Sequence, residues 1–228
     1  MSIKRRTQAL LDQSGLTAKM TRKNFREVIA RYASLEKTLD IGSGGYSLYG
    51  EYFPNRVAVD IKEQPGVDIV ADVHNLSIFE DSSFGIVLCT EGLEHFYDPK
   101  QAIAELARVL KPGGILILTT RFIFPLHETP HDYFRFTEYG LRYLLRDYEI
   151  LVLQEDGNTI ETLATLYQRI GYQSVTLGFK PLKFFWIVQA KILLLLKRVL
   201  SNEFGDVAGK EPVSHIMTTG YLAVAKKR

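Results

Sequence analysis

The sequence predicts an α/β fold in which helices cover a mostly parallel β-sheet. Short apolar segments alternate with amphipathic ones along the chain, which is the pattern of strands alternating with helices. The segment 86–89 (Ile-Val-Leu-Cys) is apolar throughout, as expected of a strand that is covered on both faces. The 228 residues, of which 46% are hydrophobic and 24% charged, are typical of one soluble globular domain, alone or with appendages.

The strands and helices are expected from local signals taken in order. Strands are expected at 37–41, 57–60, 67–71, 86–89, 115–119, 148–153 and 221–225. A helix is expected from Thr21, because Phe25, Val28, Ile29 and Tyr32 form one apolar face. Further helices are expected at 137–146 and 158–170. The clearest helix follows Asp98, a good N-cap, and Pro99 at the first helical position, and Lys111-Pro-Gly-Gly114 ends it.

Composition limits the classes of protein to which the chain can belong. Cys89 is the only cysteine, which excludes an internal disulfide framework, and it is expected to be a small core residue. A formal charge of +2 is too balanced for a protein that mainly binds nucleic acid. Residues 1–20 are expected to be an N-terminal arm without the apolar core of a signal peptide, and no segment is long enough to span a bilayer. We expect one domain over 21–228 and a cytoplasmic location.

A glycine-rich loop and three aspartates indicate a nucleoside site. Leu39-Asp-Ile-Gly-Ser-Gly-Gly45 follows the first strand, where a ligand-binding loop of such a sheet is found. Asp60 ends the second strand 20 residues after Asp40, the spacing of a carboxylate that binds ribose hydroxyls. Asp72 ends the third strand, where a carboxylate can reach the amine of an adenine.

Two classes of nucleoside cofactor fit this pattern to different degrees. A dinucleotide fingerprint would need its third glycine at Ser47, and Asp40 would repel a pyrophosphate. Asp40 could instead serve S-adenosylmethionine, a ligand that carries an amino group and a sulfonium. A nicotinamide-dependent oxidoreductase and a non-catalytic nucleoside-binding protein remain the alternatives.

The sequence resembles class I S-adenosylmethionine-dependent methyltransferases, and in particular their type 11 family, over about residues 35–155. Asp40-Ile-Gly-Ser-Gly-Gly is similar to their first motif, and Ala71-Asp-Val-His-Asn-Leu-Ser to their adenine-contacting segment. The stretch from Leu93-Glu-His to Lys111-Pro-Gly-Gly114 is the most specific part of the resemblance. Tyr46 departs from the family, where many members carry another glycine.

The resemblance implies a Rossmann-like three-layer sandwich whose seven-stranded, mostly parallel sheet has an antiparallel last strand, inserted between the fifth and sixth-position strands. It implies S-adenosylmethionine as the cofactor and a set of cofactor-binding residues. These are Asp40, Gly42, Gly44, Asp60, Ile61, Asp72, Val73 and Thr90.

Methyl transfer to a hydroxyl needs a group that takes up a proton, and histidine is the usual one. The candidates are His95 after the fourth strand and His127 and His131 after the fifth, although His95 also fits a structural or cofactor-side role. No metal site is predicted, because Pro130 breaks any helix between His127 and His131 and no third cluster of ligands is apparent.

The acceptor is expected to be a small molecule or a glycan- or lipid-linked group, with oxygen as the expected acceptor atom. Tyr133 and Arg135, in a loop dense in polar and aromatic residues, are expected to bind it through its carboxylate, phosphate or sugar hydroxyls. Methylation of nucleic-acid bases is disfavoured, because Thr90-Glu-Gly-Leu93 replaces the Asn/Asp-Pro-Pro-aromatic motif of amino-group methyltransferases.

The segment 180–200 predicts a basic amphipathic helix inserted before the last strand. Its cations Lys183, Lys191, Lys197 and Arg198 gather on one sector of a helical wheel, and it has no acidic residue. It could pack on the sheet or on a second subunit, or lie in a membrane interface with Trp186 in the acyl boundary. Peripheral membrane contact and a homodimer are both left open.

Overall fold

The computed structural model describes residues 21–22, 24–176, 180–196 and 216–228. The chain divides into two compact units. The larger contains 24–156 and 220–228, and the described residues of the smaller include 157–176, 180–196 and 216–219. The predicted arm at 1–20 lies outside the described residues, and one domain over 21–228 stays a prediction.

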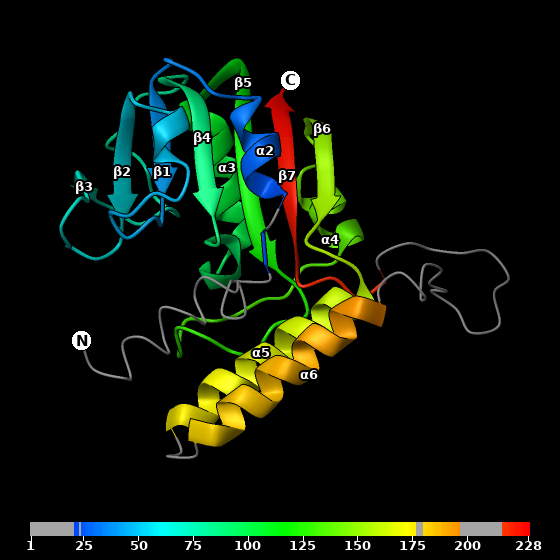
Figure 1. Cartoon of the computed structure of the whole chain (residues 1–228). Coiled ribbons are helices and arrows are strands. Elements are labelled where there is room, and N and C mark those ends of the chain that lie inside the picture. The colour runs from blue at the N-terminus through cyan, green and yellow to red at the C-terminus, as the bar shows by residue number, and fades with distance from the viewer. Residues whose placement is uncertain (1–20, 23, 177–179, 197–215) are drawn as a thin grey trace, which may run out of the picture. The chain divides into compact units, whose positions relative to one another are not determined.

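The larger unit is built on a seven-stranded sheet with the order β3-β2-β1-β4-β5-β7-β6 (Figure 1). The strands are β1 (Thr38–Ile41), β2 (Arg56–Asp60), β3 (Ile69–Val70), β4 (Phe84–Thr90), β5 (Leu110–Arg121), β6 (Tyr148–Glu155) and β7 (Gly220–Lys227). Neighbours from β3 to β5 pair in parallel, and β7 pairs antiparallel with both β5 and β6. The predicted Rossmann-like sandwich with an antiparallel last strand is confirmed.

Parallel pairing places the carboxyl ends of the central strands next to one another along one edge of the sheet. In the register of the central strands, Asp40 lies beside Ala58 of β2 and Leu88 of β4. Thr90, the last residue of β4, lies beside Thr119 of β5. Because the strands run the same way, whatever follows their carboxyl ends shares this edge.

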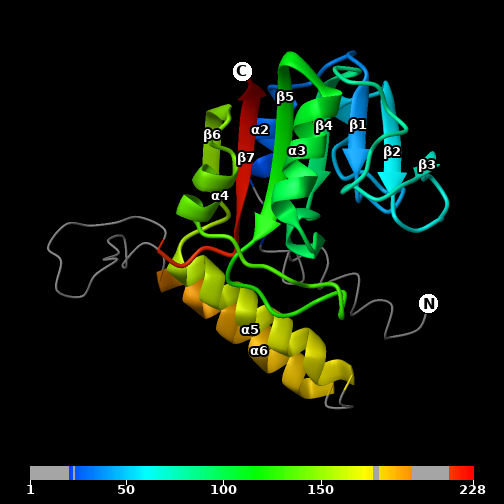
Figure 2. The ribbon, with the colours of Figure 1, turned by 180° about the vertical axis from the view of Figure 1, so that it is seen from behind.

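Successive side chains of a strand point to opposite faces of the sheet, so the core consists of two apolar layers, one on each face. Val87 and Cys89 face the layer of α3 (Pro99–Val109) and α4 (Glu138–Leu144), where Leu106 and Leu141 are fully buried. Ile86 and Leu88 face the other layer, which contains α2 (Phe25–Ala30). The two views of the ribbon show α2 on one face of the sheet and α3 and α4 on the other (Figure 2). Cys89 is a buried core residue, as predicted, and burial raises the pKa of its thiol.

Element boundaries differ from the sequence expectations where tertiary pairing extends or shortens a segment. Helix α2 has only six residues, Phe25–Ala30. Strand β5 begins at Leu110 rather than at 115. Leu110 pairs with Phe84 and Ile115 with Ile86, so the residues 111–114 form a bulge that holds Pro112 outside the regular ladder.

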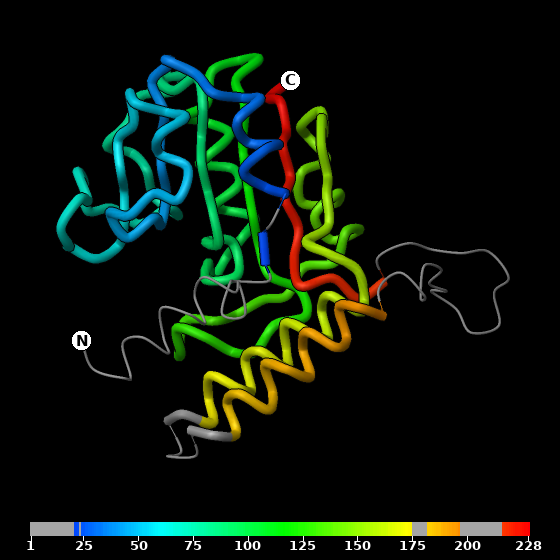
Figure 3. The backbone as a smooth tube through the Cα atoms, viewed as in Figure 1, coloured from blue at the N-terminus to red at the C-terminus, as the bar shows by residue number. Residues whose placement is uncertain are grey.

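The smaller unit contains a helical hairpin, α5 (Thr159–Thr176) and α6 (Lys180–Leu196), which lie side by side (Figure 3). Asn158 and Glu161 exchange side-chain and backbone hydrogen bonds of 3.0 and 3.2 Å at the start of α5, which is a capping arrangement. Ala164 and Ala190 are fully buried, and the small side chains allow a close approach of the two helices. The predicted helix near 158–170 is therefore confirmed and longer.

Arg108 fastens the segment between β3 and β4 to helix α3. Its guanidinium donates to the carbonyl oxygens of Leu76 and Phe79 at 2.8 and 2.9 Å and to Asp81 at 2.7 Å. It also donates to both oxygens of Glu105 at 3.0 Å, and this pairing raises the pKa of Arg108. Arg108 therefore ties the segment that follows Asp72 to α3, together with Gln101 and Glu105, which bond to the carbonyl oxygen of His74 and to the N–H of Leu76.

We expect Arg108→Met to lower the free energy of unfolding by about 2 kcal/mol, because the two carbonyl oxygens and two carboxylates lose their shared donor. Chemical denaturation measures this loss. Arg31→Met is the control: it removes an exposed pair with Glu27, which should contribute at most about 0.5 kcal/mol. Equal effects of the two substitutions would contradict the role given to Arg108.

Candidate functional site

The first part of the candidate site is the loop after β1. Gly42, Gly44 and Gly45 have φ angles of 71°, 60° and 74°, a conformation that favours glycine. A Cβ on Gly45 would lie 2.2 Å from the carbonyl oxygen of Pro65, so the loop packs there without a side chain. A Cβ on Gly42 would meet nothing within 4 Å, and open space therefore borders the loop at that residue.

Asp40 is a fully buried carboxyl at the carboxyl end of β1. Its Oδ1 accepts no hydrogen bond within the described structure, and its Oδ2 lies 3.4 Å from the guanidinium of Arg56. Burial raises the pKa of Asp40, while Arg56 and nearby serines act in the opposite direction. A buried oxygen without a partner costs free energy, and a donor supplied by a ligand would satisfy it.

Asp60 holds the glycine loop against the end of β2. Its Oδ2 accepts from the backbone N–H of Gly44 and its Oδ1 from that of Lys62, each at 3.0 Å. Each carboxylate oxygen can accept a further hydrogen bond, because each has two acceptor positions. Asp60 can therefore bind a pair of hydroxyls while it keeps the loop in place.

Asp72 lies beyond β3 and binds His74. Its Oδ1 accepts from the backbone N–H of His74 at 2.9 Å and lies 2.5 Å from Nδ1 of the same residue. Partial burial opposes a fall in the pKa of Asp72, but the bonds to His74 lower it, so the carboxyl is ionised at neutral pH. The imidazole of His74 in turn stacks on Tyr97 with ring centroids 3.8 Å apart.

The remaining predicted cofactor residues also lie at this edge. Ile61 is exposed directly after β2, Val73 is buried beside Asp72, and Thr90 is the buried last residue of β4. The parallel register therefore brings Asp40, Asp60 and Thr90 to the ends of three neighbouring strands. Their roles in binding stay predictions.

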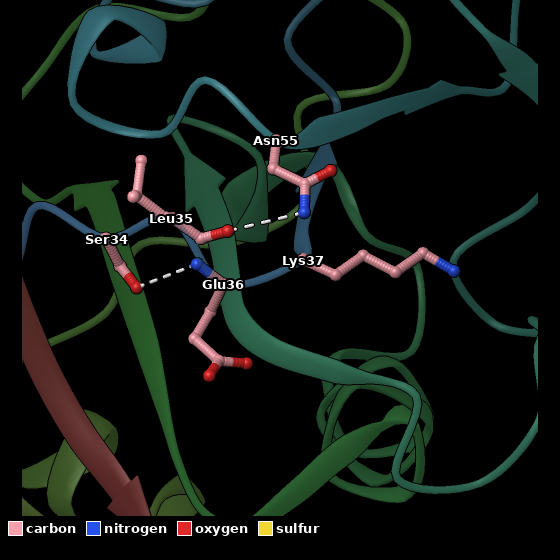
Figure 4. Close-up of a pocket in the computed structure, with 5 residues that line it drawn as sticks. All are labelled: Ser34, Leu35, Glu36, Lys37 and Asn55. Atoms are coloured by element: carbon pink, nitrogen blue, oxygen red, sulfur yellow. Dashed lines mark hydrogen bonds between the residues drawn. The ribbon is translucent and has the colours of Figure 1, made fainter.

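An open cavity of about 490 Å³ lies at the opposite ends of the strands. It is lined by Ser34, Leu35, Glu36, Lys37 and Asn55, which precede β1 and β2 (Figure 4). Two hydrogen bonds join its lining residues, one from the Asn55 side chain to the carbonyl oxygen of Leu35 and one from the N–H of Glu36 to the Ser34 hydroxyl. No nucleoside motif lies there, and the glycine loop is at the other edge of the sheet.

The three predicted histidines meet next to the carboxyl ends of β4 and β5. The rings of His95 and His127 are T-shaped with centroids 4.7 Å apart. Nδ1 of His95 lies 2.7 Å from the carbonyl oxygen of His131, whose own ring lies 3.0 Å from the hydroxyl of Tyr133. Burial, with a smaller effect of His95, lowers the pKa of His127 below its usual value, so this imidazole is neutral at neutral pH.

Glu94 is a residue of this cluster that sequence reasoning missed. It lies in the short 3₁₀ turn η2 (Leu93–His95), is fully buried, and its Oε2 accepts from the hydroxyl of Thr120 at 2.8 Å. Its Oε1 accepts no hydrogen bond from the residues that the structure describes and lies 3.8 Å from Nε2 of His127. Burial and the charge of Glu91 raise the pKa of Glu94.

The backbone of Glu94 also fixes the predicted acceptor loop. Its carbonyl oxygen accepts from the N–H groups of Tyr133 and Phe134 at 2.9 and 3.2 Å. Tyr133 is half-exposed beside the histidines. The only sequence signal for Glu94 was its place in the Leu-Glu-His motif, where a glutamate in a turn is ordinarily solvated.

Arg135 is occupied by an internal partner. Its guanidinium donates to both oxygens of Asp132, at 2.5 and 2.7 Å, and approaches the carbonyl oxygens of Phe124 and Pro125. Hydrogen bonds from Arg135 lower the pKa of the buried Asp132 side chain to about 2. Asp132 also accepts from the N–H of His127 at 2.9 Å, so this pair holds the histidine in place.

Glu91 begins a second buried network at the end of β4. It has a positive φ of 59°, forms an ion pair with Arg121, and accepts from the hydroxyl of Thr119 at 3.1 Å. Arg121 also pairs with Asp156 at 3.6 Å. Both carboxylates of this network are paired with the same guanidinium, in contrast to Glu94 beside it.

Comparison with known proteins agrees with this geometry. Residues 39–118 match the family model described as "Methyltransferase domain", which includes the glycine loop and the Glu94 turn. A ubiquinone biosynthesis O-methyltransferase from Hahella chejuensis is 32% identical over 129 residues, 49% of this chain and 51% of the relative. A demethylmenaquinone methyltransferase from Renibacterium salmoninarum is 39% identical over 57 residues, 25% of this chain and 24% of the relative.

The chain thus spans about half or less of the length of these curated relatives. A solved structure of an S-adenosylmethionine-dependent methyltransferase from Thermotoga maritima has a TM-score of 0.55 at 14% identity, covers 98% of this chain and 97% of its own, and shows the fold. The chain therefore has the fold of class I methyltransferases, and residues 39–118 match the methyltransferase family model.

The pairing of Asp132 with Arg135 should contribute to the free energy of unfolding by an amount that depends on pH. A carboxyl whose folded pKa lies below its usual 3.8 stabilises the fold above that value, and the contribution is lost as pH falls through about 2. The difference in unfolding free energy between wild type and Asp132→Asn should be constant above about pH 4. It should shrink by up to about 2.5 kcal/mol toward pH 2.

Denaturation at a series of pH values measures that difference. The control is the same comparison in an Arg135→Leu background, where the shrinkage should largely disappear because the main cause of the low pKa is gone. A difference that stays constant down to pH 2 in the wild-type background contradicts the pairing.

Proposed function

We propose that this protein transfers a methyl group from S-adenosylmethionine to an oxygen atom of a small, lipid-linked acceptor. The observation that carries the proposal is the buried, unpartnered Oδ1 of Asp40 next to a glycine loop, within the segment that matches the methyltransferase family model. Asp40 would accept from the amino group of the cofactor, and Gly42 leaves room for its approach.

The nucleoside would lie across the ends of β2 and β3. Asp60 has one acceptor position left on each oxygen for the ribose hydroxyls. Asp72 uses Oδ1 for His74, so Oδ2 would take the exocyclic amine of the adenine. Ile61 and Val73 would cover the two faces of the base, and Thr90 would border the sulfonium.

The cofactor supplies an electrophilic methyl group, and the chain must hold an acceptor in line with it and exclude water. Glu94 and His95 lie in the turn after β4, and His127 lies in the loop after the neighbouring strand β5, with its ring against that of His95. A neutral His127 can take up a hydroxyl proton through Nε2, because its Nδ1 lies near the acceptors Pro125 O and Asp132. Tyr133 would present its hydroxyl to the acceptor.

Oxygen as the acceptor atom is supported by the relative named for ubiquinone biosynthesis O-methylation. The names of both curated relatives refer to quinones, ubiquinone in one and demethylmenaquinone in the other. The low identity and partial coverage leave glycan-linked acceptors as the second candidate. Arg135 is bound to Asp132, so an anionic acceptor would have to compete with that pair.

The cofactor part of the proposal is tested by Asp60→Ala. Loss of the ribose contact should weaken S-adenosylmethionine binding by about 1.5–3 kcal/mol, measured by titration calorimetry. Asp68→Ala is the matched control, since the Asp68 carboxylate accepts from the N–H of Ala58 in the middle of β2 and is not one of the predicted cofactor-binding residues. NADH should not bind. Unchanged affinity in a folded Asp60→Ala protein, or preferential binding of NADH, contradicts the site, and bound cofactor without methyl turnover points to a non-catalytic protein.

We further propose that helix α6 contacts a membrane surface, where a lipid-linked acceptor would lie. Ile187 and Ala190 face α5, whereas a second face leaves large apolar side chains exposed. These are Leu182, Phe184, Phe185, Ile192, Leu195 and Leu196. Of the basic sector expected from the sequence, Lys183 lies toward α5, over the ring of Tyr172 at 4.9 Å. Lys197 and Arg198 lie outside the described residues.

An exposed apolar face on a helix that has no acidic residue is typical of a helix that lies in a membrane interface. Among the described residues, no helix combines the length and apolar character needed to cross a bilayer. The proposal therefore concerns binding at the surface alone. A homodimer through the same face is the competing outcome.

Co-sedimentation with anionic vesicles at low salt tests this contact. The wild-type protein should bind, and Leu195→Asp or Phe185→Asp should weaken binding at least tenfold, because each places a charge on the exposed face. Leu35→Asp is the control, since Leu35 is equally exposed in the larger unit. If vesicles are ignored and the mass in solution is that of a dimer that Leu195→Asp separates, the face binds a second copy instead.

A further inference from the structure

Three atoms of the metal-ligand type converge beside the carboxyl ends of β4 and β5. They belong to Glu94 and His95, in the turn η2, and to His127, in the loop after β5, and lie within 4.8 Å of one another. The turn and the loop are joined by hydrogen bonds from Tyr133 and Phe134 to the carbonyl oxygen of Glu94. The group is therefore held by two neighbouring strand ends.

The carboxyl of Glu94 has an oxygen that lacks a partner. The side chain has no exposed surface, its Oε2 accepts from Thr120, and its Oε1 accepts no hydrogen bond. The distance of 3.8 Å from Oε1 to Nε2 of His127 is too long for a hydrogen bond and leaves space between the two atoms. A cation in this space would satisfy both.

Both imidazoles are oriented as metal-bound histidines are. Nδ1 of His95 lies 2.7 Å from the carbonyl oxygen of His131, an acceptor, so this nitrogen carries the hydrogen and Nε2 keeps a lone pair. Nδ1 of His127 lies 3.3 Å from the carbonyl oxygen of Pro125 and 3.4 Å from Asp132 Oδ2. A carbonyl or carboxylate on the far nitrogen is the usual outer partner of a ligating histidine.

We propose that Oε1 of Glu94 and the Nε2 atoms of His95 and His127 bind a divalent transition-metal ion. Two imidazoles and one carboxylate are a ligand set for Zn²⁺, Fe²⁺, Mn²⁺ or Co²⁺, whereas Mg²⁺ prefers oxygen ligands alone. Metal–ligand distances of about 2.1 Å require ligand atoms roughly 3–3.5 Å apart, so the three side chains close on the ion by about 1 Å. The remaining coordination positions are open to water or substrate.

Nearby polar side chains that already have other partners are excluded from the proposed ligand set. Glu91 is bound to Arg121 and Thr119. The ring of His131 is bound to the hydroxyl of Tyr133. Asp132 is a positioning residue, since it reaches the ion only through His127.

The proposed metal site also indicates the chemical class of the methyl acceptor, and this statement about the acceptor rests on the proposed function. With the ion bound, Nε2 of His127 is a ligand and no longer takes up the proton. A hydroxyl bound at an open position then loses its proton to water near neutral pH, because a divalent cation stabilises the oxyanion. The oxyanion then forms the bond to the methyl carbon as that carbon's bond to sulfur breaks. Phenols and vicinal diols, which coordinate cations through oxygen, are the acceptors that fit.

Metal binding is tested on the full chain after removal of metals with a chelator. Titration with Co²⁺ should give one ion per chain with the visible absorption of a nitrogen- and oxygen-ligated site, and Zn²⁺ should displace it. Glu94→Gln and His127→Asn should each weaken Co²⁺ binding at least 100-fold. Asp132→Asn should weaken it 10–100-fold.

His131→Ala is the matched control and should bind Co²⁺ within a few-fold of wild type, because only its backbone carbonyl contributes. The absence of the Co²⁺ spectrum in the wild type, or its persistence in a folded Glu94→Gln/His127→Asn double variant, overturns the proposal. Calorimetry with S-adenosylmethionine on the metal-free protein keeps the two proposals separate. A metal site without cofactor binding contradicts the proposed function alone, and cofactor binding without a metal site contradicts this inference alone.

Discussion

The fully buried carboxyl of Glu94 imposes the main constraint on the edge of the sheet where the candidate site lies. One oxygen is satisfied by Thr120 of β5, and the backbone carbonyl of the same residue accepts two N–H groups from the loop after β5. The turn after β4 and the loop after β5 therefore cannot move apart without leaving several buried polar groups unpaired. His95 and His127 meet because these two segments are joined in this way.

The charges around this edge fall into two groups. Glu91 and Asp156 share the guanidinium of Arg121, and Asp132 pairs with Arg135, so these carboxylates have partners within the protein. Asp40 and Glu94 are buried and each keeps one oxygen without a hydrogen bond. Among the described residues, these two carboxyl oxygens, at the ends of β1 and β4, are the buried ones without a partner, and a ligand contributes most there.

The same edge serves two different tasks. The ends of β1, β2 and β3 present aspartates and a glycine loop suited to a nucleoside, and the ends of β4 and β5 present imidazoles and a carboxyl suited to an acceptor. Parallel strands make this division possible, because consecutive strand ends lie next to one another while the loops that follow can differ freely. The cavity in front of β1 and β2, at the other ends of these strands, has no part in it.

The sequence by itself determined the order of the elements, the three aspartates and the glycine loop, because each depends on residues that are close in the chain. Asp98 does cap α3, with bonds to Lys100 and Gln101, as its position before Pro99 predicts. Local periodicity also placed the core, since alternation in β4 depends only on neighbouring residues. The family resemblance supplied the place of β7, which no local pattern contains.

Tertiary structure alone decided which polar groups meet. Glu94 and His127 are 33 residues apart, and nothing in either segment states that their side chains lie 3.8 Å apart. The sequence predicts Arg135 as an acceptor-binding residue, whereas in the folded loop its guanidinium is bound to Asp132. Among the described residues, one apolar face of α6 packs against α5 and another is exposed. Burial and pairing are properties of the folded chain, because they depend on what every other segment leaves exposed.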